Sequence, residues 1–117
     1  MYQIKYAKGK SKYGNNSQVY NGRRYDSKRE AAYAMDLDWR KKAGEIKEWI
    51  SQFKIDLRVN GRHITNYFVD FKVIMADGSV QFHEVKGAII KPWPLKWALL
   101  EALKDEIEPG CELIVIK

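Results

Sequence analysis

The sequence predicts one α/β domain, with a mixed central sheet flanked by helices, in the order helix, three-strand meander, helix, strand. Two stretches have the 3.6-residue period of amphipathic helices, and Asn-Gly and Asp-Gly turns join three strand-like runs between them. The apolar run at residues 112–116 suits a strand that pairs parallel to an earlier one. With 117 residues, the chain is long enough for one hydrophobic core and too short for two.

Residues 1–19 are predicted to form a flexible basic arm, and residues 20–117 the domain. Residues 1–29 hold eight Lys and Arg against one acid, a net charge of +7, whereas residues 30–117 hold thirteen against fourteen, a net charge of −1. Tyrosines alternate with these cations, a pattern typical of phosphate and base contacts, so we expect a nucleic acid partner; a solubilising tail is the alternative. The candidate DNA contacts are Lys8, Lys10, Lys12, Arg23, Arg24, Lys28 and Arg29.

Local signals predict a hairpin and two helices outside the meander. Asn21-Gly22 is a type I′ hairpin signal, and Ser27 then begins a helix that ends near Ala43, before Gly44. Pro92 and Pro94 mark the start of a second helix that continues to about Glu108. The apolar stripe expected on the first helix is Ala32, Met35, Trp39 and Ala43, and that on the second is Leu95, Leu99, Ala102 and Leu103.

The meander is predicted as strands 46–59, 62–75 and 79–86, with an irregularity near Ser51-Gln52. The alternation of side chains along a strand places Val69, Phe71, Val73 and Met75 on one face and Asp70 on the other. A two-residue turn at Asp77-Gly78 would set Asp70 nearly opposite Val85, between Glu84 and Lys86. The two carboxylates and the lysine would then meet.

These three side chains could form a metal-dependent phosphodiesterase site. Cleavage of a phosphodiester needs oxygen ligands for Mg²⁺, a nucleophilic water and a positive group for the developing charge. A solvated pair of surface charges is the alternative for Glu84 and Lys86. Asp70, however, lies in the apolar run YFVDFKVIM, where an unpaired carboxylate would be costly.

Glu30 offers a third carboxylate, although Ser27 and Glu30 also fit a capping box at the start of the first helix. Other candidates are weaker. By strand alternation His83 lies on the face opposite Glu84, so packing is expected, and His63 lies beside a turn. Trp93 and Trp97 could stack on bases, but aromatic residues at helical spacing are more often part of the core.

Several classes of protein are disfavoured. The single cysteine, Cys111, allows no intrachain disulfide or cysteine-based zinc site and fits a reducing compartment. No run is long enough to span a membrane, and no signal peptide is visible, so we expect a cytoplasmic protein. The glycine-rich phosphate loops of nucleotide-binding proteins do not occur.

Glu30 on the first helix, Asp70 in the second strand and Glu84-x-Lys86 in the third resemble the PD-(D/E)XK nuclease superfamily over residues 20–117. YDSKREAAYAMDL, KAGEIKEW, ITNYFVDF and HEVKG look like a small phage and prophage family within it, similar to endonuclease I-type Holliday junction resolvases. The resemblance implies a restriction-endonuclease-like αβββαβ core. Val69 stands where the name-giving motif has proline.

The resemblance also implies roles for these residues. Asp70, Glu84 and the Val85 carbonyl would ligate Mg²⁺, which Mn²⁺ is expected to replace, and Glu30 would hold a metal directly or through water. Lys86 would position or deprotonate the attacking water. Gln52 is a candidate accessory residue.

We therefore expect a Mg²⁺-dependent DNA endonuclease that selects branched DNA, such as Holliday junctions, or double-stranded DNA during phage DNA recombination or processing. The symmetry of a four-way junction requires two active sites for its resolution, so a homodimer is expected. The setting would be the cytoplasm of a bacterial host, for a phage or prophage protein. The alternatives are a nuclease for DNA ends or nicks in packaging or repair, and a non-catalytic nucleic-acid-binding module with the same fold.

Overall fold

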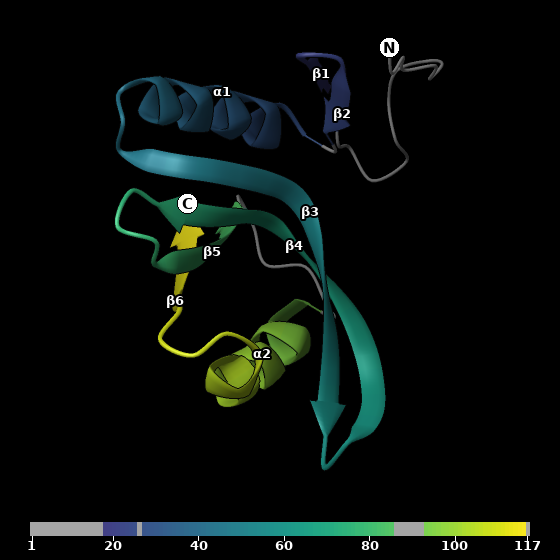
Figure 1. The fold of residues 1–117 in the computed structure, drawn as a ribbon. Coiled ribbons are helices and arrows are strands. Elements are labelled where there is room, and N and C mark those ends of the chain that lie inside the picture. Colours follow the sequence, from purple (N-terminus) through teal and green to yellow (C-terminus); the bar gives the residue numbers. More distant parts are fainter. Residues whose placement is uncertain (1–17, 26, 86–92, 117) are drawn as a thin grey trace, which may run out of the picture.

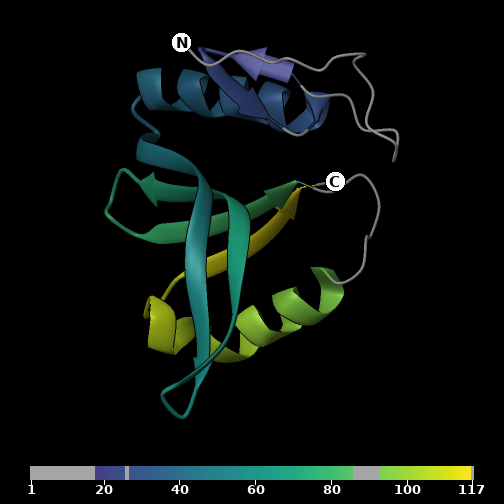
Figure 2. The same cartoon turned by 90° about the vertical axis from the view of Figure 1, so that its right-hand side faces the viewer.

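The computed structural model describes residues 18–25, 27–85 and 93–116, which contain six strands and two helices. Four strands form a mixed sheet in the order β3-β4-β5-β6, antiparallel except for β5 and β6, which are parallel. Helices α1 and α2 lie on opposite sides of this sheet (Figure 2). The predicted α/β class and mixed sheet are therefore confirmed. The elements are β1 (Gln18–Tyr20), β2 (Arg23–Tyr25), α1 (Lys28–Lys42), β3 (Ile46–Val59), β4 (Arg62–Met75), β5 (Val80–Val85), α2 (Trp93–Ile107) and β6 (Glu112–Ile116).

The hairpin and the start of α1 follow from local sequence. Asn21 and Gly22 have φ of 54° and 80°, the two positive values that a type I′ turn requires, and Tyr20 pairs with Arg23 across it. Ser27 is the N-cap of α1, and its Oγ accepts a hydrogen bond from the Glu30 backbone N–H at 3.1 Å. Both predictions are confirmed.

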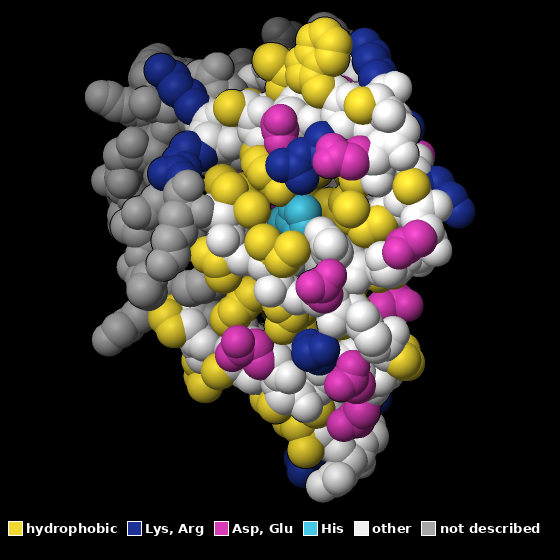
Figure 3. Space-filling model, turned by 90° about the vertical axis from the view of Figure 1, so that its left-hand side faces the viewer, with side chains coloured by type: hydrophobic (Ala, Val, Ile, Leu, Met, Phe, Trp, Pro, Cys, Tyr) yellow, Lys and Arg dark blue, Asp and Glu magenta, His cyan; other side chains and the backbone are white. Residues whose placement is uncertain are grey.

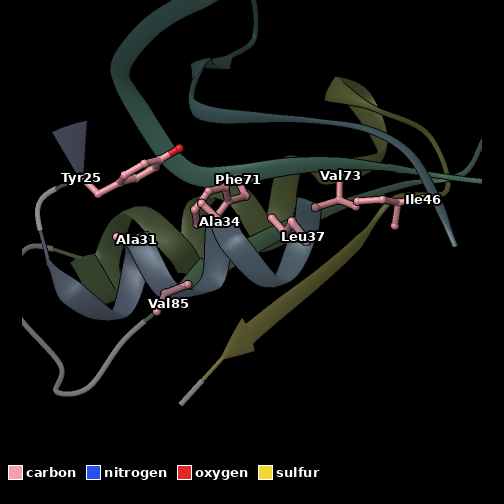
Figure 4. Close-up of a cluster of buried hydrophobic side chains, with 8 residues drawn as sticks. All are labelled: Tyr25, Ala31, Ala34, Leu37, Ile46, Phe71, Val73 and Val85. Atoms are coloured by element: carbon pink, nitrogen blue, oxygen red, sulfur yellow. The ribbon is translucent and has the colours of Figure 1, made fainter. Parts of the chain in front are cut away.

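The apolar stripe predicted for α1 is wrong. Met35 and Trp39 are 46% and 64% exposed, and Ala32 and Ala43 are exposed as well. Figure 3 shows hydrophobic side chains at the top of the molecule, over this helix. The buried positions are instead Ala31, Ala34 and Leu37, which pack with Phe71 and Val73 (Figure 4). Ala31 and Ala34 are small, so the helix backbone can pack closely against the sheet on this side. The larger Met35 and Trp39 are on the exposed part of the helix.

Helix α2 packs on the other face of the sheet, mainly through Trp97 and Leu100. Leu99 and Leu103 are partly buried against this cluster, as predicted, but Leu95 is 72% exposed and Ala102 is exposed. The buried stripe is rotated toward Trp97, whose large ring occupies the contact with the sheet. The Trp97 and Tyr67 rings form an edge-on pair, which confirms the expected core role of Trp97. Within the described residues, neither helix is long and apolar enough to cross a membrane.

Strand β3 bends where it passes from α1 toward α2, and β4 follows it (Figure 1). Gln52 lies in this segment with φ of 50°, which confirms the predicted irregularity. The bend changes which helix the strand faces: Phe71 packs in the α1 cluster, whereas Val69 packs in the α2 cluster. The prediction that these two side chains share a face is therefore wrong, because it assumed a straight strand.

The turn between β4 and β5 is one residue longer than predicted. The Met75 N–H donates to the Ser79 carbonyl at 2.8 Å, so the loop consists of residues 76–78, with Gly78 at φ of 91°. Phe71 then pairs with His83. Continued by one residue, this register sets Asp70 opposite Glu84 rather than Val85. The longer loop therefore brings Asp70 and Glu84 closer in register than a two-residue turn would have done.

Candidate functional site

The site begins where β4 leaves β5. Regular pairing of these strands extends only to Phe71 and His83, and side chains make the next two contacts. The Asp70 backbone N–H donates to Glu84 Oε1 at 3.0 Å, and the Val85 N–H donates to Asp70 Oδ2 at 2.8 Å. Where β4 and β5 diverge, the carboxylates of Asp70 and Glu84 thus act as acceptors in place of backbone carbonyls. The two backbone N–H groups in turn hold these carboxylates in place.

Gln52 links this pair of strands to α1. Its Nε2 lies 3.5 Å from Asp70 Oδ1 and 3.5 Å from Glu30 Oε2, both at the long limit of a hydrogen bond. Two 3.5 Å contacts to the same nitrogen put these carboxylate oxygens no more than 7 Å apart. The positive φ of Gln52 turns the strand at the position where its amide reaches both acids. The structure therefore brings Glu30, Gln52, Asp70 and Glu84 together.

All three acids of this group are buried: Glu30, Asp70 and Glu84 are 8%, 6% and 1% exposed. A buried carboxylate loses its hydration, and neighbouring carboxylates repel one another, so positive charge close to them is stabilising. The first half of the predicted capping box is present, because Ser27 Oγ accepts from the Glu30 N–H. Glu30 therefore belongs to the helix start and to the acidic group at the same time.

The donor chemistry suits Mg²⁺ with an incomplete protein shell. Among the described residues, no three His, Cys, Asp or Glu side chains form a ready-made metal cluster. Mg²⁺ usually keeps several waters and takes one or two protein carboxylates, together with oxygens of a phosphate substrate. Asp70 and Glu84 match that requirement, and Glu30 contacts Asp70 through the Gln52 amide. The set fits a cation completed by water and substrate better than a closed protein cage.

Several predicted residues lie outside this geometry. Lys86, Lys8, Lys10 and Lys12 are not among the described residues, and neither are the side chains of Arg23 and Arg24. Lys28 and Arg29 are exposed on the first turn of α1, next to Glu30. They place positive charge at the edge of the acidic group, where a phosphate backbone could contact it.

His83 packs beside the site on the α1 side of β5, as strand alternation predicted. It is 2% exposed; Tyr33 Oη lies 2.7 Å from its Nδ1, and Gln81 Oε1 lies 2.8 Å from its Nε2. The amide oxygen can only accept, so Nε2 carries the proton and Nδ1 accepts from the Tyr33 hydroxyl. Burial lowers the pKa of His83 to about 4, with a smaller contribution from Arg40. A neutral imidazole thus connects α1 to the strand that carries Glu84.

Asp38 is a structural residue that the sequence analysis missed, because its partners come from other elements. Its carboxylate accepts from Tyr20 Oη at 2.5 Å and from Trp49 Nε1 at 2.9 Å, which joins β1 and β3 to α1. The hydrogen bond to Asp38 raises the pKa of Tyr20 to about 12. The sequence does offer one signal for this role, which is an aromatic residue before the helix, Tyr20, and another after it, Trp49.

The fold and these contacts define an α/β protein with a buried acidic group at a bend in its mixed sheet. The chain belongs to the DUF1064 family, described as proteins of unknown function, whose family profile matches residues 10–108. No curated protein and no solved structure matches the chain.

Proposed function

We propose that the protein is a Mg²⁺-dependent endonuclease of the PD-(D/E)XK type that hydrolyses phosphodiester bonds in branched or double-stranded DNA. The observation that carries the proposal is the pair of hydrogen bonds at the divergence of β4 and β5, where Asp70 and Glu84 each accept from a backbone N–H. The adjacent Glu30 and Gln52 complete the acidic group. Phage DNA recombination or processing and a homodimeric assembly remain part of this proposal.

Each group of the chain has a definite part in the proposed reaction. Bound Mg²⁺ would supply an activated water and offset negative charge on the phosphate. Asp70, Glu84 and the Val85 carbonyl would hold it, and the Asp70 and Val85 N–H groups fix the two carboxylates in advance. Gln52 would keep Glu30 and Asp70 together. Lys86, which follows Val85 in the sequence, would orient the water and steady the transition-state charge.

The experiment is to incubate the protein and Mg²⁺ with a four-way junction, a fork, a nicked duplex, a linear duplex and a single strand. Internal cuts near the branch are expected, with Mn²⁺ replacing Mg²⁺ and EDTA abolishing the reaction. Cleavage confined to ends or nicks would favour a packaging or repair enzyme instead. Binding without cleavage of any substrate would favour a non-catalytic DNA-binding module.

Isosteric variants test the site itself. Asp70→Asn and Glu84→Gln keep side-chain size but remove the negative charge, so each should lower the rate of cleavage about 100-fold or more. Lys86→Ala should have an effect of the same order. Glu101→Gln is the matched control, because Glu101 is exposed on α2, and it should cleave like the wild type. Thermal unfolding by circular dichroism checks that each variant folds. Wild-type rates in folded Asp70 and Glu84 variants would show that the site is misassigned.

A further inference from the structure

Beyond the bend, β3 and β4 continue as a two-stranded ribbon with two unlike faces. The inner face is apolar and packs on the α2 cluster through Ile55, Leu57, Tyr67 and Val69. The outer face carries the alternate residues, among them Lys54 and Phe68, which lie directly opposite each other in the register. Figure 1 shows the ribbon extending past α2. One side of the ribbon is thus fixed to the core, and the other faces solvent.

The pair of Lys54 and Phe68 lies close to the acidic group along the ribbon. Gln52 and Lys54 are two residues apart on β3, as are Asp70 and Phe68 on β4. Residues two apart on a strand are about 7 Å from each other. The register continues through this segment, with Ser51 paired to Phe71 and Phe53 to Val69. The pair of Lys54 and Phe68 is therefore one step along the ribbon from Gln52 and Asp70.

Phe68 is 52% exposed, although its neighbours Tyr67 and Val69 are buried. Burying a phenylalanine side chain is worth about 2–3 kcal/mol, so an exposed ring forgoes a sizeable stabilisation. Lys54, opposite the ring, has no carboxylate within ion-pairing distance among the described residues. A free cation next to an exposed aromatic ring is the combination that binds a phosphate and stacks on a base.

The composition of this face favours DNA over a second protein surface. Asp56, two residues beyond Lys54, forms an ion pair with Arg58 at 2.7 Å, which offsets its charge. The next exposed apolar residue on β4 is Ile64, which is four residues from Phe68. Single apolar side chains separated by polar residues do not make the continuous patch that a protein interface needs.

We propose that Phe68 and Lys54 form a stacking site for an unpaired base beside the scissile phosphate, so that the substrate class is DNA with a base already outside the duplex stack. Bases inside a continuous duplex expose no face to such a ring, whereas a branch, fork or frayed nick does. Lys54 contacts the adjacent phosphate. This inference rests on the proposed nuclease function, because it names the substrate of the same site.

The test measures stacking without requiring cleavage. A fork with 2-aminopurine at the branch point is titrated with protein in EDTA, and the fluorescence and the affinity are compared with those of a continuous duplex. Phe68→Ala should remove the fluorescence change and weaken fork binding roughly tenfold, the effect of losing one stacked base, with duplex binding unchanged. Phe68→Trp should retain both properties. Ile64→Ala is the matched control, since Ile64 is 51% exposed on the same strand, and it should bind like the wild type.

Two results would overturn the stacking site. One is equal fork binding and equal fluorescence for Phe68→Ala and wild type. The other is a change of oligomeric state in Phe68→Ala, by light scattering, with the fluorescence signal retained, which would assign the ring to a second copy of the chain.

Failure of the stacking site can be told apart from failure of the nuclease. If no metal supports cleavage but Phe68→Ala loses the fluorescence change, the stacking site stands and the nuclease proposal fails. If forks are cleaved equally with and without Phe68, the nuclease proposal stands and the stacking site fails.

Discussion

At the scale of single residues, the Tyr33 and His83 pair shows how neutral groups can support an acidic site. Each ring nitrogen of His83 has a fixed role, since Nδ1 accepts from Tyr33 and Nε2 donates to Gln81. Protonation of Nδ1 would convert that acceptor into a donor and place a charge in the core. The burial that lowers the pKa of His83 to about 4 also keeps this arrangement intact at neutral pH.

His83 should therefore make the protein less stable in acid. Its pKa is about 4 in the folded chain and 6.5 when unfolded, so between these values the unfolded state binds more protons. The free energy of unfolding should fall as pH drops from 6.5 to 4, by up to about 3 kcal/mol for this group. Urea unfolding at pH 7.5 and 4.5 measures it.

The matched variants for this measurement are His83→Gln and His63→Gln. Between pH 7.5 and 4.5, the stability of His83→Gln should fall less than that of the wild type. His63→Gln removes an exposed imidazole but leaves His83 in place, so it should keep most of the fall. Identical pH dependence in wild type and His83→Gln would mean that His83 is not held neutral in the folded protein.

The residue scale also shows which site members could be predicted. Asp70 and Glu84 were found because a carboxylate within an apolar run and a short turn are both local signals. Their bonding to backbone N–H groups could not be predicted, because it depends on the pairing of β4 with β5 stopping at Phe71, one residue short of Asp70. Asp38 was missed because its two partners, Tyr20 and Trp49, come from different elements.

At the scale of elements, the bend in β3 organises the site. Gln52 has φ of 50°, and among the described residues the other non-glycine positions with positive φ are Asn21 and Asn60, both in turns. The left-handed region costs a residue with a Cβ roughly 1–2 kcal/mol, and asparagine tolerates it better than glutamine. A glycine would remove this strain, so the presence of glutamine argues for a use of its amide.

Substitutions at Gln52 should separate the backbone from the side chain. Gln52→Ala keeps the strain, so it should be less stable than Gln52→Gly by about 1 kcal/mol. Both variants lack the amide that links Glu30 and Asp70, so both should lose cleavage to a similar extent. Urea unfolding and a cleavage assay provide the two measurements.

Lys54 is the control for stability, because it is an exposed position of regular strand on the same β3. There the order should reverse, with Lys54→Gly about 0.5–1 kcal/mol less stable than Lys54→Ala. The same order at both positions would show that Gln52 is not strained.

Element boundaries were predictable to a greater extent than the faces that elements bury. Asn21-Gly22 and Asn60-Gly61 specify turns locally, and β3 and β4 have the predicted ends. The buried face of α1 was not predictable, because Met35 and Trp39 look more like core residues than Ala31 and Ala34 do. Close packing against Phe71 decides that face, and this contact is not local in sequence.

At the scale of the whole molecule, the excess of positive charge lies in the N-terminal quarter of the sequence. The net charge is +7 over residues 1–29 and −1 over residues 30–117. An acidic cation site alone would repel a phosphate backbone, so a nuclease of this type needs positive charge from elsewhere in the chain. In the proposed nuclease, the N-terminal segment would supply it.

Salt dependence of DNA binding should locate this contribution. Each lysine that contacts a phosphate adds about 0.9 to the slope of log affinity against log salt concentration. Lys10→Gln with Lys12→Gln should therefore reduce the slope for a duplex by about 2, measured by fluorescence anisotropy across a KCl series. Lys42→Gln with Lys47→Gln is the matched double variant: it removes the same charge from exposed positions of α1 and β3 and should leave the slope nearly unchanged. Equal slopes for the two double variants would mean that net charge alone attracts DNA and that the N-terminal lysines make no phosphate contacts.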